Sequence, residues 1–378
     1  MQKHLPIPTP EQLERSKQLC THIKNIIQAA QNGVISFAEY MQLVLYTPQL
    51  GYYMADHPIF GWEGDFTTAP ELSALFANCL ATPCRQVLEE TGGDILELGA
   101  GSGKLAVELL KSLPEIPKNY YIYEISPALR KRQKEYIQKE LPDLSQHIIW
   151  LEDLPKTFTG IIIANEVMDA LPAECFILTE QGILERGIAV DNEVFTWKNY
   201  PANERMQEYL QRIETQELPV PYISEAQICL PEWIQKLSSI LQRGTILFFD
   251  YGFPRREYYH PDRSMGTLMC YYRQFAHGDP FLYPGLQDIT VHVDFTAVAE
   301  IAEANDLEVI GFVSQARFLI DAGLIDILQS NPDLSLANKH QIQILTSPAE
   351  MGELFKVMGL ARNCNIPLAG FSGPSRAI

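Results

Sequence analysis

The chain has 378 residues, of which 46% are hydrophobic and 20% charged, the composition of a globular protein with a sizeable core. Its formal net charge of −18 argues against a general nucleic-acid-binding surface, because phosphate backbones are bound by clustered lysine and arginine side chains. No apolar run approaches the roughly 18 residues that a membrane span needs, so we expect no membrane insertion.

The cysteines and the N-terminal segment give information on the cellular compartment in which the protein works. Seven cysteines are scattered without a Cys-x-x-Cys pair, and no ordered histidine set accompanies the closest two, Cys79 and Cys84. This pattern favours reduced thiols and no metal site. The N-terminal segment holds prolines and then charges, without the apolar stretch of a secretory signal. We therefore expect a cytoplasmic protein.

Helical signals begin near the N-terminus. Thr9-Pro10-Glu11-Gln12 predicts a capped helix that ends at Gly33, and Ser36 to Glu39 predicts a second helix that ends before Pro48. Residues 48–70 are rich in glycine and aromatic side chains and are expected to form an irregular loop. We interpret residues 1–90 as a helical N-terminal extension followed by this loop.

From residue 94 onward, strands and helices alternate. Helices are expected to begin at Lys104 and after Ser126-Pro127. Strands are expected at 94–98, 120–125, 147–151, 160–164 and 245–250. This alternation is typical of parallel βαβ units in a doubly wound α/β sheet. We interpret residues 91–378 as one such domain, interrupted by α+β insertions at about 173–230 and 254–292.

A glycine-rich turn follows the first of these strands. Gly99, Gly101 and Gly103 allow the backbone to turn tightly and to approach a ligand closely. The helix that follows presents free N–H groups to an anionic or polar ligand. In an open parallel sheet, ligands bind beyond the carboxyl ends of the strands, which is where this turn lies.

The residues that flank the glycines separate three classes of cofactor. A phosphate-binding P-loop is excluded, because Leu98 and Leu105 stand where glycine and serine or threonine are required. The dinucleotide fingerprint fails too, since Lys104 occupies the position of its third small residue. The segment instead resembles the first motif of class I methyltransferases, which bind S-adenosyl-L-methionine (SAM). The resemblance implies that SAM is bound by Glu97, Gly99, Ala100, Gly101, Ser102 and Gly103.

Acidic residues follow the next two strands. Glu124 lies 23 residues beyond Gly101, where a carboxylate accepts hydrogen bonds from both ribose hydroxyls of NAD or SAM. Asp153, followed by Leu154, lies where such folds contact the adenine base. The alternatives are a surface carboxylate at a helix start for Glu124 and an ordinary loop aspartate for Asp153.

Asn165, Glu166 and Asp169 follow the strand at 160–164 and are the predicted catalytic residues. Methyl transfer from a sulfonium requires an aligned nucleophile with an available lone pair. Asn165 and Glu166 can supply both, and either Glu166 or Asp169 can hold or deprotonate an amine or a guanidinium. Helix capping by Asn165 and pairing of Glu166 with the helix dipole remain the alternative.

A set of ordered sequence blocks extends over nearly the whole chain: Ile35 to Met41, Gly51-Tyr52-Tyr53, Gly64 to Glu71, Leu96 to Gly103, Asn165-Glu166, Asp169 to Pro172, Asp250-Tyr251-Gly252, Asp288, Thr290, His292 to Phe295 and Met351 to Phe355. Together these blocks resemble the MidA-type methyltransferases, a family that includes a mitochondrial arginine methyltransferase of complex I assembly.

The resemblance implies a Rossmann-like class I methyltransferase fold with a seven-stranded, mostly parallel sheet. It places the Gly64 to Glu71 loop near the cofactor and adds Gly64, Asp65 and Thr67 to the SAM-binding residues. It implies an arginine side chain of a protein as the acceptor, in the mitochondrial relative on a respiratory complex I subunit. An acidic surface suits a partner protein with a basic segment.

Two other functions stay open. A small-molecule acceptor is one, since the aromatic residues Tyr251, Phe253, Tyr258, Tyr259, Tyr271 and Tyr272 can line a pocket. A non-catalytic assembly factor that keeps the cofactor fold is the other. The sequence leaves open the identity of the acceptor, single or double methylation, a monomer or a homodimer, and a lid role for residues 254–292.

Overall fold

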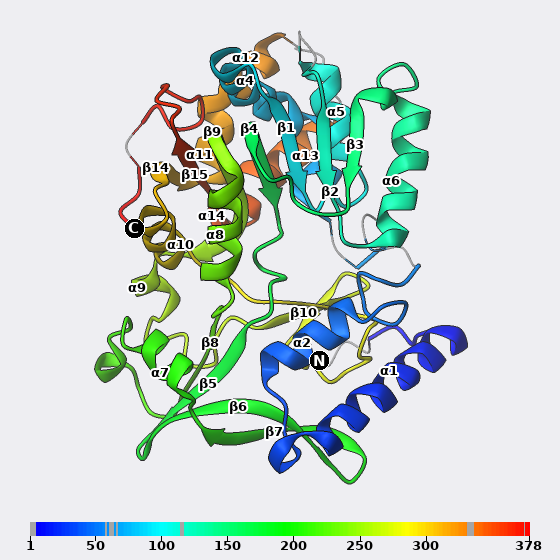
Figure 1. Cartoon of the computed structure of the whole chain (residues 1–378), viewed down its shortest axis with the longest axis vertical. Coiled ribbons are helices and arrows are strands. Elements are labelled where there is room, and N and C mark those ends of the chain that lie inside the picture. Colours follow the sequence, from blue (N-terminus) through cyan, green and yellow to red (C-terminus); the bar gives the residue numbers. More distant parts are fainter. Residues whose placement is uncertain are drawn as a thin grey trace. The chain divides into compact units, whose positions relative to one another are not determined.

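The computed structural model describes residues 5–56, 59, 64–65, 67–113, 117–330, 336–373 and 375–378. The chain forms two compact units, and the elements of each can be followed in Figure 1. The first unit comprises Met1–Phe66, Asp169–Leu230 and Arg255–Val293. The second comprises Thr67–Met168, Pro231–Pro254 and Asp294–Ile378. The N-terminal helices thus cluster with the two predicted insertions, while the limits 1–90 and 91–378 stay a prediction.

The second unit is an α/β sheet with helices on both faces. Its helices and strands are α3 (Ala69–Leu72), α4 (Ala74–Thr91), β1 (Asp94–Leu98), α5 (Lys104–Ser112), β2 (Tyr120–Tyr123), α6 (Pro127–Glu140), β3 (Ile148–Leu151), β4 (Phe158–Asn165), α8 (Leu230–Ile240), β9 (Leu241–Phe253), α10 (Phe295–Ala304), β14 (Glu308–Ser314), α11 (Gln315–Leu319), α12 (Ile325–Ser330), α13 (Leu336–Thr346), α14 (Met351–Leu354) and β15 (Phe355–Arg362).

The strands follow the order β14-β15-β9-β4-β1-β2-β3, and the short β13 (Val293–Asp294) pairs with β9 off this path. The pairs from β9 to β3 are all parallel, whereas β15 runs antiparallel to both of its neighbours. From β1 the chain winds outward through β2 and β3, then crosses to β4 on the other side. The strand order therefore switches between β1 and β4, and such a point is where doubly wound sheets bind ligands.

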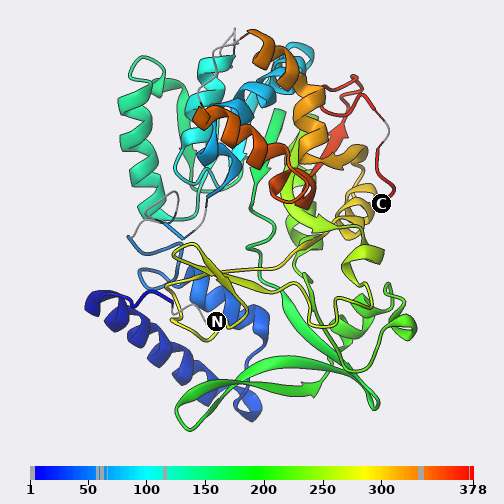
Figure 2. The ribbon, with the colours of Figure 1, turned by 180° about the vertical axis from the view of Figure 1, so that it is seen from behind.

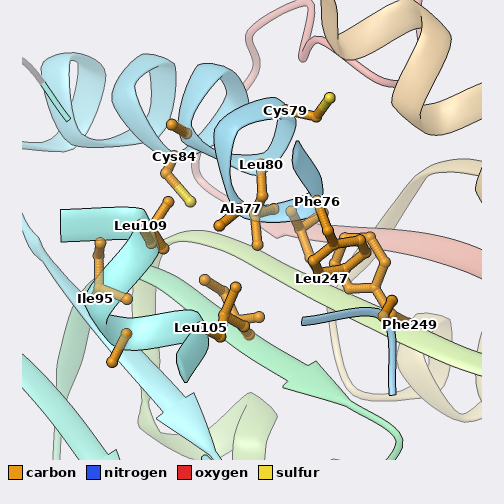
Figure 3. Close-up of a cluster of buried hydrophobic side chains, with 14 of the residues drawn as sticks. Phe76, Ala77, Cys79, Leu80, Cys84, Ile95, Leu105, Leu109, Leu247 and Phe249 are labelled. Carbon is orange, nitrogen blue, oxygen red and sulfur yellow. The ribbon is translucent and has the colours of Figure 1, made fainter. Parts of the chain in front are cut away.

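One face of the sheet is covered by α4, α5, α11 and α13, whose buried side chains share a cluster with the strands. Figure 2 shows α4, in blue, and the orange α11 in front of the strands. The close-up in Figure 3 shows Phe76 and Leu80 of α4 packed over Leu247 and Phe249 of β9. The rings of Phe76 and Phe249 meet edge to face, with centroids 5.2 Å apart.

The opposite face is covered by α8 and α10. Successive strand residues point to opposite faces, so Phe248 lies on the other side from its neighbour Phe249. It packs on Trp233 of α8, with ring centroids 5.6 Å apart. Phe295 of α10 packs in the same way on Phe312 of β14, at 5.0 Å. Burial on both faces explains the unbroken apolar run of β4, where Ile161, Ile162 and Ile163 are all fully buried.

The first unit combines helices with two antiparallel sheets, ordered β7-β6-β5-β8 and β11-β10-β12. Its elements are α1 (Pro10–Ala29), α2 (Phe37–Tyr46), β5 (Glu174–Thr179), β6 (Gly182–Asp191), β7 (Val194–Pro201), α7 (Glu204–Leu210), β8 (Tyr222–Ala226), α9 (Arg255–Tyr258), β10 (Met269–Tyr272), β11 (Phe275–His277) and β12 (Asp288–Thr290). Thr9 and Gln12 form the predicted reciprocal cap of α1.

The predicted α/β class and mostly parallel sheet are confirmed. Some limits differ from the prediction. The strand expected at 245–250 extends over Leu241–Phe253, since it pairs with β4 and β15 along most of its length. The strand expected at 120–125 ends at Tyr123. In the part of the chain that the structure describes, no helix is long and apolar enough to cross a membrane.

Candidate functional site

The predicted site residues of the second unit begin where β1, β2 and β4 end. Leu98, the last residue of β1, pairs with Tyr123 of β2 and with Ala164 of β4. The next residues along each strand are the glycine turn, Glu124 and Asn165. Because parallel strands end at the same edge, the structure brings these three groups to the switch point of the sheet.

The glycine turn requires glycine for its backbone conformation. Gly99, Gly101 and Gly103 have φ values of 63°, 54° and 84°, in the left-handed region that other residues seldom adopt. A Cβ atom on Gly99 would lie 3.1 Å from a methyl carbon of Val167. Gly103 directly precedes α5, so the first N–H groups of that helix face the turn. Ala100, between the glycines, is buried.

Glu71 of α3 is tied to this turn. The hydroxyl of Ser102 donates to the Glu71 carboxylate, and Lys104 Nζ donates to the backbone oxygen of Glu71 over 2.6 Å. Thr67 is half-buried and lies just before α3. The resemblance predicted that this stretch accompanies the cofactor site, and its C-terminal end does contact the glycine turn.

Glu124 is almost completely buried at the end of β2. One carboxylate oxygen accepts from the backbone N–H of Ser126 over 2.9 Å, and the other from Nε2 of Gln133 over 3.1 Å. Burial raises the pKa of Glu124 to about 6, against the lowering effect of these donors and of Arg130. Gln133 was not among the predicted site residues, although a signal exists: it is the polar member of the buried row Leu129, Gln133 and Ile137 on α6.

Glu97 is buried within β1, one residue before the end of the strand. Its Oε2 accepts a hydrogen bond of 2.8 Å from the hydroxyl of Tyr120. Burial raises the pKa of Glu97 to about 7, the Tyr120 hydrogen bond lowers it, and the nearby Glu124 carboxylate raises it further. A cationic group of a ligand would relieve this penalty by stabilising the ionised carboxylate.

Asn165 is the last residue of β4, and Glu166 follows it. Nδ2 of Asn165 donates to Oε1 of Glu166 over 3.1 Å, while Oδ1 of Asn165 is buried and has no hydrogen-bond partner within the described ranges. Glu166 has a φ of 52°, a strained value for a residue with a side chain. Its N–H donates to the oxygen of Phe249 over 2.8 Å, which holds that conformation.

Asp250 of β9 also holds this loop and was not among the predicted site residues. Its Oδ2 accepts a hydrogen bond of 2.9 Å from the backbone N–H of Met168. Asp153 and Leu154, the predicted adenine contacts, follow β3; Asp153 is exposed and Leu154 is half-buried. Asp250 belongs to one of the family-like blocks, which was the available signal for it.

The remaining predicted residues belong to the first unit. Gly64 and Asp65 are buried next to the hairpin that joins β10 to β11. The Asp65 carboxylate accepts 2.9 Å and 2.6 Å hydrogen bonds from the Tyr52 hydroxyl and the Arg273 N–H. Burial raises the pKa of Asp65 to about 6. Both carboxylate oxygens thus have partners inside the first unit, so Asp65 fixes the hairpin.

Asp169 is buried in the same unit, and its backbone oxygen accepts a 3.0 Å hydrogen bond from the Val291 N–H. Asp288 of β12 is buried as well and accepts a 2.8 Å hydrogen bond from the hydroxyl of Tyr53. Burial, and then the negative charges of Asp169 and Asp65, raise the pKa of Asp288 well above its ordinary value. These three aspartates and Tyr53 form what we call the acidic cluster.

The aromatic residues considered as a pocket lining largely pack into the interior. Tyr258, Tyr259 and Tyr272 are almost fully buried. Tyr258 and Tyr259 pack against each other with tilted rings whose centroids are 4.6 Å apart, and Tyr272 packs on Tyr283 at 5.5 Å. Among the side chains that the structure describes, no group of three or more His, Cys, Asp or Glu is arranged to hold a metal ion.

A family model described as "Putative S-adenosyl-L-methionine-dependent methyltransferase" matches residues 75–313, more than half of the chain. The chain belongs to this methyltransferase family. A solved structure from Burkholderia thailandensis, bound to S-adenosyl-homocysteine, is 40% identical to the enzyme. It matches with a TM-score of 0.93 over 99% of both chains. The cofactor of the methyltransferase is SAM.

Curated relatives match the enzyme over most of its length. "Protein arginine methyltransferase NDUFAF7 homolog, mitochondrial" of Drosophila melanogaster is 30% identical, covering 90% of this chain and 86% of the relative. "Protein arginine methyltransferase NDUFAF7, mitochondrial" of Homo sapiens is 27% identical, covering 87% and 80%. These names contradict the cytoplasmic location that we expected. That expectation was wrong because scattered, unpaired cysteines and a segment without an apolar signal stretch are compatible with more than one reducing aqueous compartment.

The residues at the switch point fit SAM. The turn has three glycines at positive φ, which leaves its backbone bare toward a ligand. Glu124 offers a fixed carboxylate for a ribose diol, and Asn165 presents a buried acceptor whose partner is missing among the described residues. When bound, SAM supplies an electrophilic methyl group on a sulfonium. The residues of this edge are those that would bind and orient it.

Proposed function

We propose that the methyltransferase modifies an arginine side chain of a protein that presents a basic segment. The observation that carries this proposal is the acidic cluster, where Asp169 and Asp288 are both buried and the charge of Asp169 disfavours ionisation of Asp288. A guanidinium stabilises both carboxylates, because opposite charges within a few ångströms favour the ionised forms. The names of the curated relatives support the same acceptor. By analogy with the family resemblance, we propose a respiratory complex I subunit as a candidate acceptor.

The proposed roles follow from the chemistry of a guanidinium. It is protonated at neutral pH and is a poor nucleophile. One nitrogen would have to lose a proton as its bond to the methyl carbon forms, while the bond from that carbon to sulfur breaks and S-adenosyl-homocysteine leaves as the neutral thioether. Glu166 accepts that proton at its carboxylate. Asn165 orients Glu166 through the 3.1 Å hydrogen bond between Nδ2 and Oε1. Asp169 pairs with the guanidinium and keeps it aligned.

We propose that SAM is bound by the residues predicted from the sequence. The proposed SAM-binding residues are Gly64, Asp65, Thr67, Glu97, Gly99, Ala100, Gly101, Ser102, Gly103, Glu124, Asp153 and Leu154. The support differs between them: the glycine turn and Glu124 lie at the switch point, whereas the hydrogen bonds of Asp65 favour a structural role.

The acceptor is tested by methyl transfer from tritiated SAM to a lysate of a strain that lacks this gene. We expect labelled protein bands whose acid hydrolysates release labelled methylarginine. Label in small molecules alone would establish the small-molecule alternative and overturn our proposal. The absence of any label, with SAM binding intact by calorimetry, would favour the non-catalytic assembly factor.

The roles are tested with charge-neutralising variants. We expect Glu166→Gln to abolish transfer without weakening SAM binding. Asp169→Asn is expected to raise the KM for the acceptor at least tenfold, which corresponds to about 1.4 kcal/mol. Glu180→Gln is the matched control, because Glu180 is an exposed carboxylate in the turn between β5 and β6. Full turnover by Glu166→Gln would remove Glu166 from the mechanism.

A further inference from the structure

Gln133 of α6 connects three segments of the sheet edge through one side chain. Its Nε2 donates to the backbone oxygen of Gly101 over 2.9 Å and to Oε2 of Glu124 over 3.1 Å. Its Oε1 accepts from the indole N–H of Trp150 on β3 over 2.9 Å. Gln133 is fully buried, and both amide hydrogens and the amide oxygen are used.

Only a primary amide can make this set of contacts. A carboxylate has no hydrogen to donate, and lysine and arginine have no acceptor for Trp150. A cation would also neutralise Glu124, whereas the amide fixes that carboxylate and leaves its charge available. The chemistry of the three contacts therefore specifies glutamine at this position.

The contact to Glu124 fixes the orientation of its carboxylate. One oxygen accepts from the Ser126 N–H and the other from Gln133, so the plane of the group is held from both sides. A carboxylate has about four acceptor sites; the Ser126 and Gln133 bonds use one on each oxygen, and the backbone N–H of Ile125 also donates to the group. The carboxylate is thus held by three protein donors and keeps acceptor capacity for a hydroxyl of a vicinal diol such as a ribose.

The same side-chain amide also fixes the glycine turn, through its contact to Gly101. Gly101 has a φ of 54° and its oxygen is the acceptor, so the amide restrains the middle of the turn. The Cγ atom of Gln133 would lie 3.5 Å from a Cβ atom placed on Gly103. The side chain thus lies directly beneath the turn and sets its distance from Glu124.

We propose that Gln133 is a positioning residue for SAM binding, which holds the Glu124 carboxylate and the glycine turn in the relative placement that a ribose diol requires. The inference rests on the proposed role of Glu124 as the ribose acceptor. It does not depend on the acceptor of the methyl group, so it is tested by cofactor binding alone.

The test compares Gln133→Leu with Gln138→Leu, the same change at an exposed position of the same helix. S-adenosyl-homocysteine and its 2′,3′-dideoxy analogue are titrated into each full-length protein by calorimetry. For Gln133→Leu we expect the Kd of S-adenosyl-homocysteine to rise about tenfold, the loss of about one hydrogen bond to a charged group. For the dideoxy analogue, which has no hydroxyls for Glu124, we expect less than a twofold change. Gln138→Leu should match the parent for both ligands.

If Gln133 had a merely structural role, Gln133→Leu would weaken the binding of both ligands equally, and that result would overturn the proposal. An unchanged Kd for S-adenosyl-homocysteine would overturn it as well. Should Gln133→Leu fail to fold, Trp150→Phe removes the donor to Gln133 while keeping an aromatic ring at that position. It should give the same preference between the two ligands with a smaller effect, about twofold to threefold. If Trp150→Phe and the parent then bound both ligands with equal affinity, the proposed role of Gln133 would be contradicted.

Discussion

Replacing Glu97 with glutamine should raise the stability of the methyltransferase relative to the parent protein by more at high pH than at low pH. The pKa of Glu97 is raised from 4.5 to about 7 by burial, so the folded protein holds this proton more tightly than the unfolded chain does. The stability that Glu97 contributes is therefore fully present below pH 4.5 and is lost as the pH rises through 7. Glu97→Gln removes this loss, because the amide stays neutral at every pH.

The magnitude follows from the size of the shift. A shift of one pKa unit corresponds to about 1.4 kcal/mol. The free energy of unfolding of Glu97→Gln should therefore exceed that of the parent by about 3 kcal/mol at pH 8 and by less than about 1 kcal/mol at pH 5. The amide oxygen can still accept from the Tyr120 hydroxyl. Its new N–H groups need acceptors, and leaving one unpaired costs about 1–3 kcal/mol at any pH. This cost cancels when the two pH values are compared.

The assay is urea unfolding of the parent protein and of Glu97→Gln at pH 5 and pH 8. We expect the stability difference between the two proteins to change by about 2 kcal/mol in favour of the variant at pH 8. Glu124→Gln serves as the comparison and should show a smaller change, since the pKa of Glu124 is raised only to about 6. The same stability difference at both pH values would refute the reasoning.

Three further changes test the structure around the site. Gly160→Ala should prevent folding, because its Cβ would lie 2.0 Å from the backbone oxygen of Asp94, whereas Gly182→Ala, also at positive φ but with open space around it, should cost only about 1–2 kcal/mol by thermal unfolding. Gly99→Ala should weaken SAM binding in calorimetry through the 3.1 Å approach to Val167, and the double variant with Val167→Ala should recover part of the affinity; no recovery would locate the effect elsewhere. Asp250→Ala leaves the Met168 N–H without its carboxylate and should lower kcat more than SAM affinity, with a stability loss of at least about 1 kcal/mol; unchanged kcat would separate Asp250 from the catalytic loop.

The sequence predicts those parts of the fold that depend on local patterns. The strand expected at 94–98 is β1, and the capped helix expected from Thr9 is α1. Both follow from residues within a few positions of one another, such as the reciprocal cap of Thr9 and Gln12. The approach of the glycine turn, Glu124 and Asn165 also followed, because the carboxyl ends of parallel strands share one edge.

Other features depend on partners that are distant in the chain. The position of β15 between β9 and β14 comes from pairing across more than 100 residues on one side, as in Phe355 with Tyr251. Gln133 bonds Gly101, 32 residues away, and no local pattern indicates that contact. Asp250 supports a loop 82 residues before it. Such contacts are fixed by tertiary packing, so a single sequence yields the polar residue but not its partner.

The alternation of the two units along the chain affects folding during synthesis and the outcome of gene truncation or fusion. The first unit is complete only when residue 293 has been synthesised, and the sheet of the second needs β15, which ends at Arg362. Neither unit can finish folding on the ribosome until most of the protein has emerged, and such long-range pairing is slow. Because segments of the two units alternate along the chain, no single truncation point separates them. A truncated or fused gene therefore cannot encode the complete sheet of the second unit without also encoding the acidic cluster of the first.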